Sequence, residues 1–267
     1  MGIDALLFDV DGTLADTEEA HRHAFNVAFE RHGLDWRWQP EDYRRLLEVT
    51  GGKERIRSYI DALPLSGAER RRLLERVPAL HEDKTRIYTG IVRDSGIHLR
   101  PGVERLIHEA LDAGCRLAIA STTSAANIDA LLQATLGPRG LDLFSVIACG
   151  DQVRRKKPAP DIYRLALTTL GLGPESAVAI EDSANGLRSA QAAGLWTLVT
   201  PTFWTEGSDF DGAELVLPGL GDPASPLEGE PGARLRIAAW LSFAELAAQV
   251  TPRPKSRLAA LYEGSAP

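Results

Sequence analysis

Residues 6–14 read Leu6-Leu7-Phe8-Asp9-Val10-Asp11-Gly12-Thr13-Leu14, an apolar run that ends in two aspartates and a Gly-Thr turn. The unbroken apolar character of residues 5–8 is typical of a strand that is buried on both faces of a parallel sheet. Unpaired carboxylates at the end of such a strand are costly, so Asp9 and Asp11 need a partner. One side-chain oxygen and one backbone carbonyl from this pair can bind a divalent cation, and an all-oxygen ligand set suits Mg²⁺. The alternative is that the two aspartates only cap a turn.

The length and composition are those of a globular protein with a sizeable core. The 267 residues allow one large domain or a core with a smaller module, and they are 44% hydrophobic and 25% charged. A net charge of -7 argues against a general nucleic-acid binder, and an anionic substrate would need a local basic pocket. The sequence has only two cysteines, no apolar run of membrane-spanning length and no signal-peptide pattern. We therefore expect a monomeric cytoplasmic protein with no nucleic-acid or membrane partner.

Residues 17–96 carry helical patterns with no strand between them. Apolar side chains recur at helical spacing in residues 16–33, and further helices are predicted over 40–49, 51–63 and 66–93. Ser66 and Glu69 form a capping-box pattern at the start of the last helix, which Pro78 kinks or divides. The sequence therefore predicts a separate all-helical domain over 17–96.

Strands and helices alternate from residue 97 to 250. Strands are predicted over 116–121, 144–149, 176–180 and 196–200, and the helices are predicted over 101–113, 124–136, 159–170 and 184–193. This alternation, together with residues 1–16, predicts an α/β core with a doubly wound parallel sheet into which the helical domain is inserted. We expect a long loop over 216–232, a helix over 242–250 and a flexible tail over 251–267.

Polar side chains follow three of the predicted strands. They are Asp9 and Asp11, then Ser121, and then Glu181 with Asp182. Ligands of doubly wound sheets bind beyond the carboxyl ends of the strands, so we expect these groups to converge. The hydroxyls and backbone N–H groups of residues 121–124 can hold phosphate oxygens, although Ser124 could equally be a simple helix cap.

Four short strings resemble, in order, the four motifs of the haloacid dehalogenase superfamily. They are FDVDGTL at residues 8–14, Ser121, KKPAPD at residues 156–161, and EDSANG at residues 181–186. The resemblance implies a Rossmann-like core with a helical cap inserted between the first and second motifs. It also implies a hydrolase that forms an aspartyl-phosphate, and it disfavours a dehalogenase, which needs neither Asp11 nor Mg²⁺. A non-catalytic binding module is the remaining alternative.

The same resemblance assigns roles to the motif residues. It implies that Asp9 is the nucleophile and that Asp11 is the general acid and base. Ser121 would bind the transferring phosphoryl group. The positive charge of Lys157 would neutralise both this group and the Asp9 carboxylate. The alternative for residues 154–157 is a solvated basic run, which we prefer for the two arginines. The magnesium ligands would be Asp9, Asp11, Glu181 and Asp182, with Glu181 bound directly or through water.

The substrate must be selected largely by the helical cap, because the core chemistry serves many leaving groups. Residues 50–56, TGGKERI, combine a Gly-Gly turn, a helix N-terminus, a Lys and an Arg, and they could bind a second phosphate or form a plain helix turn. No role is assigned to His32, His81, His98 or His108. The candidate substrate contacts are Glu18, His21, Tyr43, Gly51, Gly52, Lys53 and Arg55 from the cap, and Asp11, Ser121, Thr122, Thr123, Ser124, Lys157 and Asn185 from the core.

The cap strings also resemble the CbbY family, through TGGKERI, the Asp16–Glu19 segment before His21, and Trp36 with Tyr43. This resemblance implies a Mg²⁺-dependent phosphatase that converts xylulose-1,5-bisphosphate, an inhibitor of the Calvin-cycle enzyme rubisco, to xylulose-5-phosphate. The alternatives are a sugar phosphomutase of the β-phosphoglucomutase type and a phosphatase of another sugar phosphate or bisphosphate. We expect the cap to close by hinging near residues 15–17 and 97–100.

Overall fold

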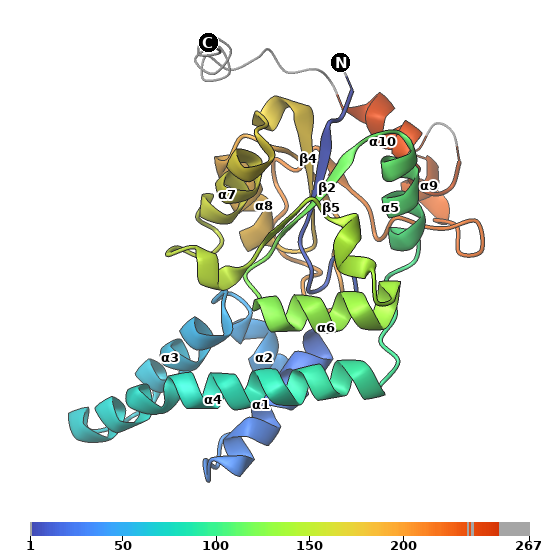
Figure 1. The fold of residues 1–267 in the computed structure, drawn as a ribbon. Helices are drawn as coiled ribbons and strands as arrows, with labels where there is room; N and C mark the ends of the chain where they lie inside the picture. Colours follow the sequence, from blue (N-terminus) through green and yellow to red (C-terminus); the bar gives the residue numbers. More distant parts are fainter. Residues whose placement is uncertain (1, 234, 236–237, 251–267) are drawn as a thin grey trace, which may run out of the picture.

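The computed structural model describes residues 2–233, 235 and 238–250, so the predicted tail over 251–267 lies outside the described residues. A six-stranded parallel sheet with the order β3-β2-β1-β4-β5-β6 lies at its centre (Figure 1). The strands are β1 (Ala5–Phe8), β2 (Arg116–Ala120), β3 (Val146–Ala148), β4 (Ala177–Glu181), β5 (Trp196–Val199) and β6 (Leu215–Val216). The prediction of a doubly wound parallel sheet is confirmed.

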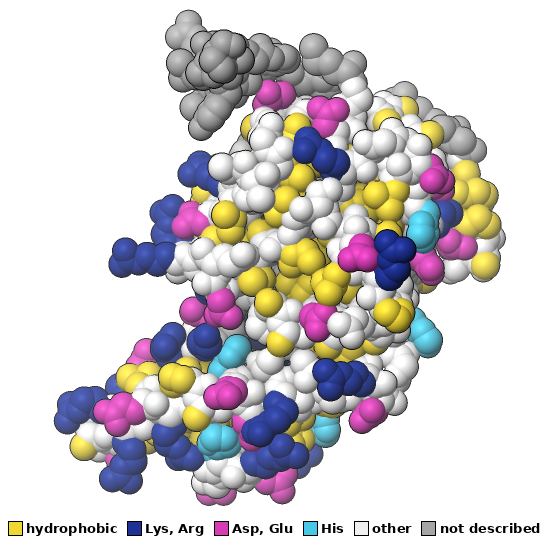
Figure 2. Space-filling view, in the orientation of Figure 1, with side chains coloured by type: hydrophobic (Ala, Val, Ile, Leu, Met, Phe, Trp, Pro, Cys, Tyr) yellow, Lys and Arg dark blue, Asp and Glu magenta, His cyan; other side chains and the backbone are white. Residues whose placement is uncertain are grey.

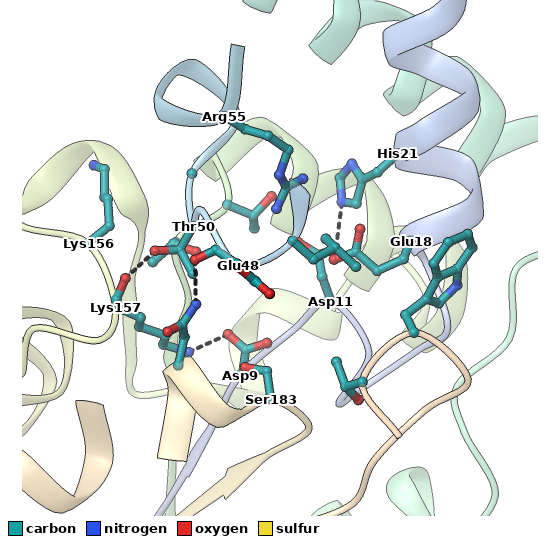
Figure 3. A pocket seen from close by; sticks show the side chains of 18 of the residues that line it. Asp9, Asp11, Glu18, His21, Glu48, Thr50, Arg55, Lys156, Lys157 and Ser183 are labelled. Carbon is teal, nitrogen blue, oxygen red and sulfur yellow. Dashed lines mark hydrogen bonds and ion pairs between the residues drawn. The ribbon is translucent and has the colours of Figure 1, made fainter. Parts of the chain in front are cut away.

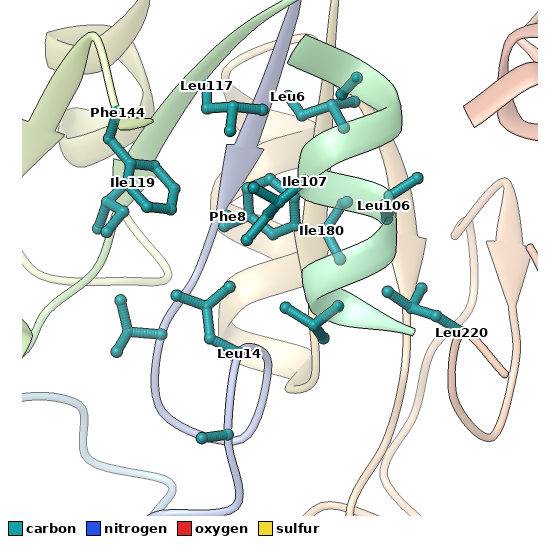
Figure 4. Close-up of a cluster of buried hydrophobic side chains, with 14 of the residues drawn as sticks. Leu6, Phe8, Leu14, Leu106, Ile107, Leu117, Ile119, Phe144, Ile180 and Leu220 are labelled. Atoms are coloured by element: carbon teal, nitrogen blue, oxygen red, sulfur yellow. The ribbon is translucent and has the colours of Figure 1, made fainter. Parts of the chain in front are cut away.

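Helices cover both faces of the sheet because alternate residues of each strand point to opposite sides. Leu6 and Phe8 of β1 pack with Leu106 and Ile107 of α5 (Figure 4), whereas Leu7 belongs to a second buried cluster on the other face. Each such fully buried side chain contributes roughly 1.5–3 kcal/mol. The helices after the first crossover are α5 (Val103–Asp112), α6 (Ala125–Leu136), α7 (Asp161–Leu170), α8 (Ala184–Ala192), α9 (Gly229–Ala233) and α10 (Phe243–Gln249).

The predicted long loop over 216–232 is partly wrong. Its first residue ends β6, and its last residues belong to α9. Strand β6 has only two residues, Leu215 and Val216, which pair with Leu198 and Val199 of β5. A pair this short carries no alternating pattern, so the sequence could not reveal it.

Residues 17–96, called the cap below, form four helices at the carboxyl end of the sheet (Figure 1). These are α1 (Glu18–Arg31), α2 (Pro40–Leu46), α3 (Gly52–Ala62) and α4 (Gly67–Asp94). They bury an aromatic cluster of their own, which includes Phe25, Phe29, Trp38 and Tyr43.

Helix α4 begins with the predicted capping box, in which Ser66 and Glu69 bond each other's backbone N–H groups. The helix is continuous over its 28 residues, so of the two predicted effects of Pro78, a kink or a division of the helix, the division is wrong. Val77 and Leu80, on either side of the proline, are buried in the cap cluster, and this packing offsets the missing backbone hydrogen bond.

The cap and the rest of the chain differ in charge. The cap holds 15 of the 30 Lys and Arg residues but only 14 of the 37 Asp and Glu residues, so the cap carries a charge of +1 and the rest of the chain a charge of -8. Figure 2 shows dark-blue Lys and Arg side chains spread over the lower part of the molecule, where the cap helices lie. The cap therefore brings positive charge to the sheet end at which an anion would bind.

Candidate active site

The ends of β1 and β4 bring three buried carboxylates together. Ligand oxygens of Asp9, Glu181 and Asp182 all lie within 4.8 Å of one another. Gly12 has φ 84°, and a Cβ there would stand 2.3 Å from Oδ2 of Asp182, so only glycine lets the first loop approach this carboxylate. The predicted convergence of the first and fourth motifs is therefore a physical contact.

Lys157 lies against this cluster and supplies one positive charge. Its Nζ donates to Oδ1 of Asp9 and to Oε1 of Glu181, both at 2.6 Å, as Figure 3 shows for Asp9. Burial opposes the charged ammonium, but the two carboxylates hold the pKa of Lys157 above its usual range. Burial raises the pKa of Asp9 to about 7 in spite of Lys157, and burial and the charge on Asp9 raise that of Asp182.

The carboxylate cluster fits a divalent cation. Three carboxylates face one buried lysine, so two negative charges remain for a metal to balance. Oε2 of Glu181 is buried and has no hydrogen-bond partner among the described residues. The all-oxygen donor set is the one that Mg²⁺ prefers.

The second aspartate is held by a separate network that the cap supplies. Oδ1 of Asp11 accepts hydrogen bonds from Thr17 Oγ1 at 2.7 Å and from His21 Nε2 at 2.8 Å (Figure 3). His21 Nδ1 lies 2.5 Å from Lys84 Nζ, and because an ammonium only donates, Nδ1 accepts and Nε2 carries the proton. Although burial opposes it, the hydrogen bonds from His21 and Thr17 hold the pKa of Asp11 well below its usual range.

A cavity of about 950 Å³ lies between the sheet end and the cap. Most of the predicted site residues line it, and only Tyr43 and Glu181 do not. The predicted residues that do line it are Asp9, Asp11, Glu18, His21, Gly51, Gly52, Lys53, Arg55, Ser121, Thr122, Thr123, Ser124, Lys157, Asp182 and Asn185.

Three of the predicted core contacts also have structural partners within the chain. The Ser124 hydroxyl accepts a hydrogen bond from the Asn127 backbone and caps α6, so the helix-cap alternative holds for that side chain. Asn185 Nδ2 donates to the carbonyl of Glu48 at 2.8 Å and thereby joins the core to the cap. Ser121 is buried at the end of β2, where its hydroxyl accepts from the Thr123 backbone.

Arg55 has a larger structural role than the sequence predicts. Its Nε donates to the carbonyls of Leu46 and Val49 at 3.1 and 3.2 Å, so it holds the C-terminal end of α2. Its Nη1 donates to the Tyr43 hydroxyl at 3.0 Å, and that hydroxyl donates to Oε2 of Glu18 at 2.8 Å. Tyr43 is fully buried behind the cavity wall. Its hydroxyl orients the charged side chains of Glu18 and Arg55, which line the cavity.

Lys53 extends from α3 to the 3-10 helix η2 (Gly150–Gln152), where its Nζ lies 3.1 Å from Oδ1 of Asp151. Both side chains are substantially exposed, so the pair is weak, and an incoming anion could compete with Asp151 for the ammonium.

Comparisons with known proteins identify the family. A model of haloacid dehalogenase-like hydrolases matches residues 3–194. The chain belongs to this family. Protein CbbY from a Cupriavidus necator plasmid is 51% identical over 245 residues, which cover 91% of this chain and 95% of the relative. Protein CbbY of Rhodobacter capsulatus is 49% identical and covers 84% and 97% of the two chains.

Structural similarity supports the same assignment. The crystal structure of a CbbY variant from Rhodobacter sphaeroides in complex with xylulose-1,5-bisphosphate has a TM-score of 0.76 and 47% identity, covering 83% of this chain and 98% of that one. This haloacid dehalogenase-like hydrolase is thus a CbbY relative and an enzyme of the phosphatase class. Every helix in the described parts of the hydrolase is too short or too polar to span a membrane.

Lys84 and His81 are among the cavity residues of this hydrolase that the sequence did not reveal. Lys84 completes the network behind Asp11, and burial lowers its pKa to about 7. His81 had been assigned no role, yet it lines the cavity next to Gly52, where a Cβ would stand 2.6 Å from its Nε2. Their spacing on α4 puts them on one helix face, but only the packing of α4 against α1 reveals that this face meets the cavity.

Proposed function

We propose that this hydrolase is a Mg²⁺-dependent phosphatase that removes one phosphate from xylulose-1,5-bisphosphate through an aspartyl-phosphate on Asp9, giving xylulose-5-phosphate. The observation that carries the proposal is one cavity in which Asp9, bonded to Lys157 and next to two further carboxylates, faces Asp11. The identities of 47% and 51% to CbbY proteins, one of them solved with this bisphosphate, support the choice of sugar.

Asp9 attacks the phosphorus through a carboxylate oxygen, and the bond to the sugar oxygen breaks. Lys157 stays bonded to the other oxygen of Asp9 and reduces the repulsion between the carboxylate and the phosphate. Ser121, Thr122 and Thr123 line the same cavity and can donate to the phosphoryl oxygens. When bound, Mg²⁺ would neutralise charge on these oxygens, held by Asp9, Asp182, the Asp11 carbonyl and Glu181 directly or through water.

Asp11 moves the protons in both steps. It donates one to the leaving sugar oxygen, and in the second step it removes one from the water that attacks the phosphorus. The bond between phosphorus and Asp9 then breaks, which restores Asp9 and releases phosphate. The proton taken from water remains on Asp11 and is the one donated in the next turnover. The hydrogen bonds from Thr17 and His21 stabilise the carboxylate of Asp11, which favours release of that proton to the leaving sugar oxygen and leaves the base that accepts the proton from water.

We further propose that residues 17–96 are a cap domain that opens and closes on a core of residues 1–16 and 97–250. Both crossings between the two parts lie side by side, since Ala15 pairs with Leu99 and the Arg100 N–H donates to the Leu14 carbonyl at 2.8 Å. Adjacent crossings can act as one hinge, and closure would exclude bulk water from Asp9.

Removal of the metal is expected to abolish phosphate release. Protein treated with EDTA and desalted should be inactive on a panel of sugar phosphates, including xylulose-1,5-bisphosphate, and added Mg²⁺ should restore it. The measured product is free phosphate. A mutase would keep the phosphate on the sugar and form an isomerised sugar phosphate, so this assay distinguishes the two activities. Full activity after chelation would contradict the metal assignment.

Lys53→Ala is expected to weaken a bisphosphate selectively. Loss of one charge-assisted contact costs about 1.5–3 kcal/mol, or roughly 10- to 150-fold in kcat/KM relative to p-nitrophenyl phosphate. Arg55 stays native, because truncating it would also release the carbonyls at the end of α2. Asp151→Asn is the matched control, since it frees Lys53 from its partner and should not lower this ratio. An unchanged ratio in Lys53→Ala would mean that residues 50–56 form only a helix turn.

A further inference from the structure

A tight turn after β5 carries two adjacent aromatic residues, Phe203 and Trp204, to the cap. Phe203 is 64% exposed and is the one large hydrophobic side chain with high exposure in the described parts of the chain. Its neighbour Trp204 extends from the core but packs with the aromatic cluster of the cap. A core side chain inside the hydrophobic cluster of the cap must separate from it whenever the cap opens.

The turn itself is anchored to the core. Thr202 and Thr205 are buried, and the Thr202 N–H donates to the Thr205 hydroxyl at 3.0 Å. The Trp204 N–H donates to the Thr202 hydroxyl at 3.2 Å, which fixes the tryptophan on the turn. At its base, Arg100 donates to the carbonyls of Gly12 and Pro201, tying the turn to the loop that carries Asp9 and Asp11. The turn is therefore a rigid part of the catalytic face.

On the cap side, the turn meets α2. The rings of Trp204 and Tyr43 lie edge to face, with centroids 5.6 Å apart and an interplanar angle of 89°. The Arg44 guanidinium lies 5.7 Å from the Phe203 ring centroid, and its Nη2 donates to the Glu206 carbonyl. Arg44 thus explains why an exposed phenylalanine stands at this position.

The contact leads directly to the cavity wall. Tyr43, against which Trp204 packs, bonds Glu18 and Arg55 through its hydroxyl, and the Arg55 guanidinium lies 5.2 Å from the Tyr43 ring centroid. Glu18, Arg55 and Trp204 all line the cavity. Figure 3 shows Glu18 and Arg55 turned toward the space above Asp11.

We propose that Trp204 is a positioning residue that holds Tyr43, and through it Glu18 and Arg55, in the geometry that recognises a phosphorylated sugar when the cap is seated on the core. The inference rests on the proposed function, because it concerns how that same cavity selects its substrate. Without Trp204, part of the binding free energy of the substrate is used to order Tyr43, Glu18 and Arg55. The substrate therefore binds more weakly.

Trp204→Leu tests the inference, with Trp36→Leu as the matched control. Trp36 is half-buried in the same cap cluster, but its ring contacts are with Phe29 and Tyr59, away from the turn. Trp204→Leu is expected to raise KM for a sugar phosphate by roughly 10-fold, the cost of ordering two charged side chains, with kcat little changed. p-Nitrophenyl phosphate should be nearly unaffected, and Trp36→Leu should change both substrates equally. An equal loss on both substrates in Trp204→Leu would overturn the inference.

A double-mutant cycle separates positioning from general loosening of the cap. Tyr43→Phe keeps the ring that Trp204 contacts but removes the hydroxyl that holds Glu18 and Arg55. In that background Trp204→Leu should cost less than about 3-fold, because the link is already cut. The same 10-fold cost in both backgrounds would contradict the proposed route. The cycle uses whichever sugar phosphate the wild type hydrolyses fastest, so an error in the proposed sugar leaves this test valid.

Fluorescence provides a measurement that is independent of turnover and of the folding of the leucine variant. With Trp204→Phe as the reference, the emission of Trp204 is obtained by difference, and its quenching by acrylamide reports whether the ring is covered. Adding Mg²⁺ with inorganic phosphate should seat the cap and reduce the quenching of Trp204. Quenching that stays unchanged while phosphate demonstrably binds would overturn the claim that Trp204 docks on closure.

Discussion

Asp9→Asn is expected to lower turnover by roughly 10³-fold or more, because an amide is a poor nucleophile and the covalent intermediate cannot form. The asparagine carbonyl can still accept the hydrogen bond from Lys157, so the geometry of the cavity should be preserved. Phosphate release measures the loss, and acid quenching during turnover should trap a phosphorylated wild-type protein but no phosphorylated variant. Asp4→Asn, at an exposed position just before the same strand, is the matched control and should be fully active. A variant that keeps a tenth of the wild-type rate would contradict the covalent mechanism.

Asp9→Asn is also expected not to lower the melting temperature. This measurement tests whether the fold survives the substitution. Burial raises the pKa of Asp9 to about 7 in the folded, metal-free protein, whereas an unfolded chain has the ordinary value of 3.8. Ionised Asp9 therefore costs folding free energy, and the penalty grows as the pH rises from the unfolded value through the folded one. Asp9→Asn removes this cost, so in EDTA at pH 8 the variant should melt no lower than the wild type.

The sheet was predictable from local patterns, and so was the gathering of polar side chains at its carboxyl edge. The apolar runs that form β1, β2, β4 and β5 are each followed by a polar or acidic residue, and the alternation of strands and helices predicts that the strands are parallel. Asp9, Ser121 and Asp182 come together because β2, β1 and β4 are neighbours in the sheet. Strand β6 was missed because two residues carry no period.

The cap side of the site was predictable only in part. The Gly51-Gly52 turn and Lys53 stand out in the sequence because glycines and a charge begin a helix. The roles of Tyr43, Lys84 and Trp204 depend on contacts between segments that are distant in the chain, such as the ring contact between α2 and the turn after β5. Periodicity identifies the buried face of a helix, but it does not say which other segment covers that face.

The division of labour between the two aspartates predicts a second large effect. Asp11→Asn is expected to lower kcat on sugar phosphates by about 10²–10⁴-fold, the usual worth of a general acid and base. An asparagine can still accept from Thr17 and His21, so the network seen around Asp11 should persist. His21→Gln, which leaves the carboxylate in place but removes its imidazole partner, should have a smaller effect.

The choice of leaving group distinguishes the two proton transfers that we propose for Asp11. p-Nitrophenolate leaves without protonation, so Asp11→Asn should still be phosphorylated by p-nitrophenyl phosphate, whereas attack by water on the aspartyl-phosphate still needs the missing base. Rapid mixing should therefore show a burst of p-nitrophenol close to the enzyme concentration, followed by a much slower steady rate. Acid quenching after the burst should trap the phosphorylated variant. A steady rate equal to that of the wild type, with no burst, would mean that Asp11 does not act on the water, and the general base would have to be sought in the neighbouring His21–Lys84 pair.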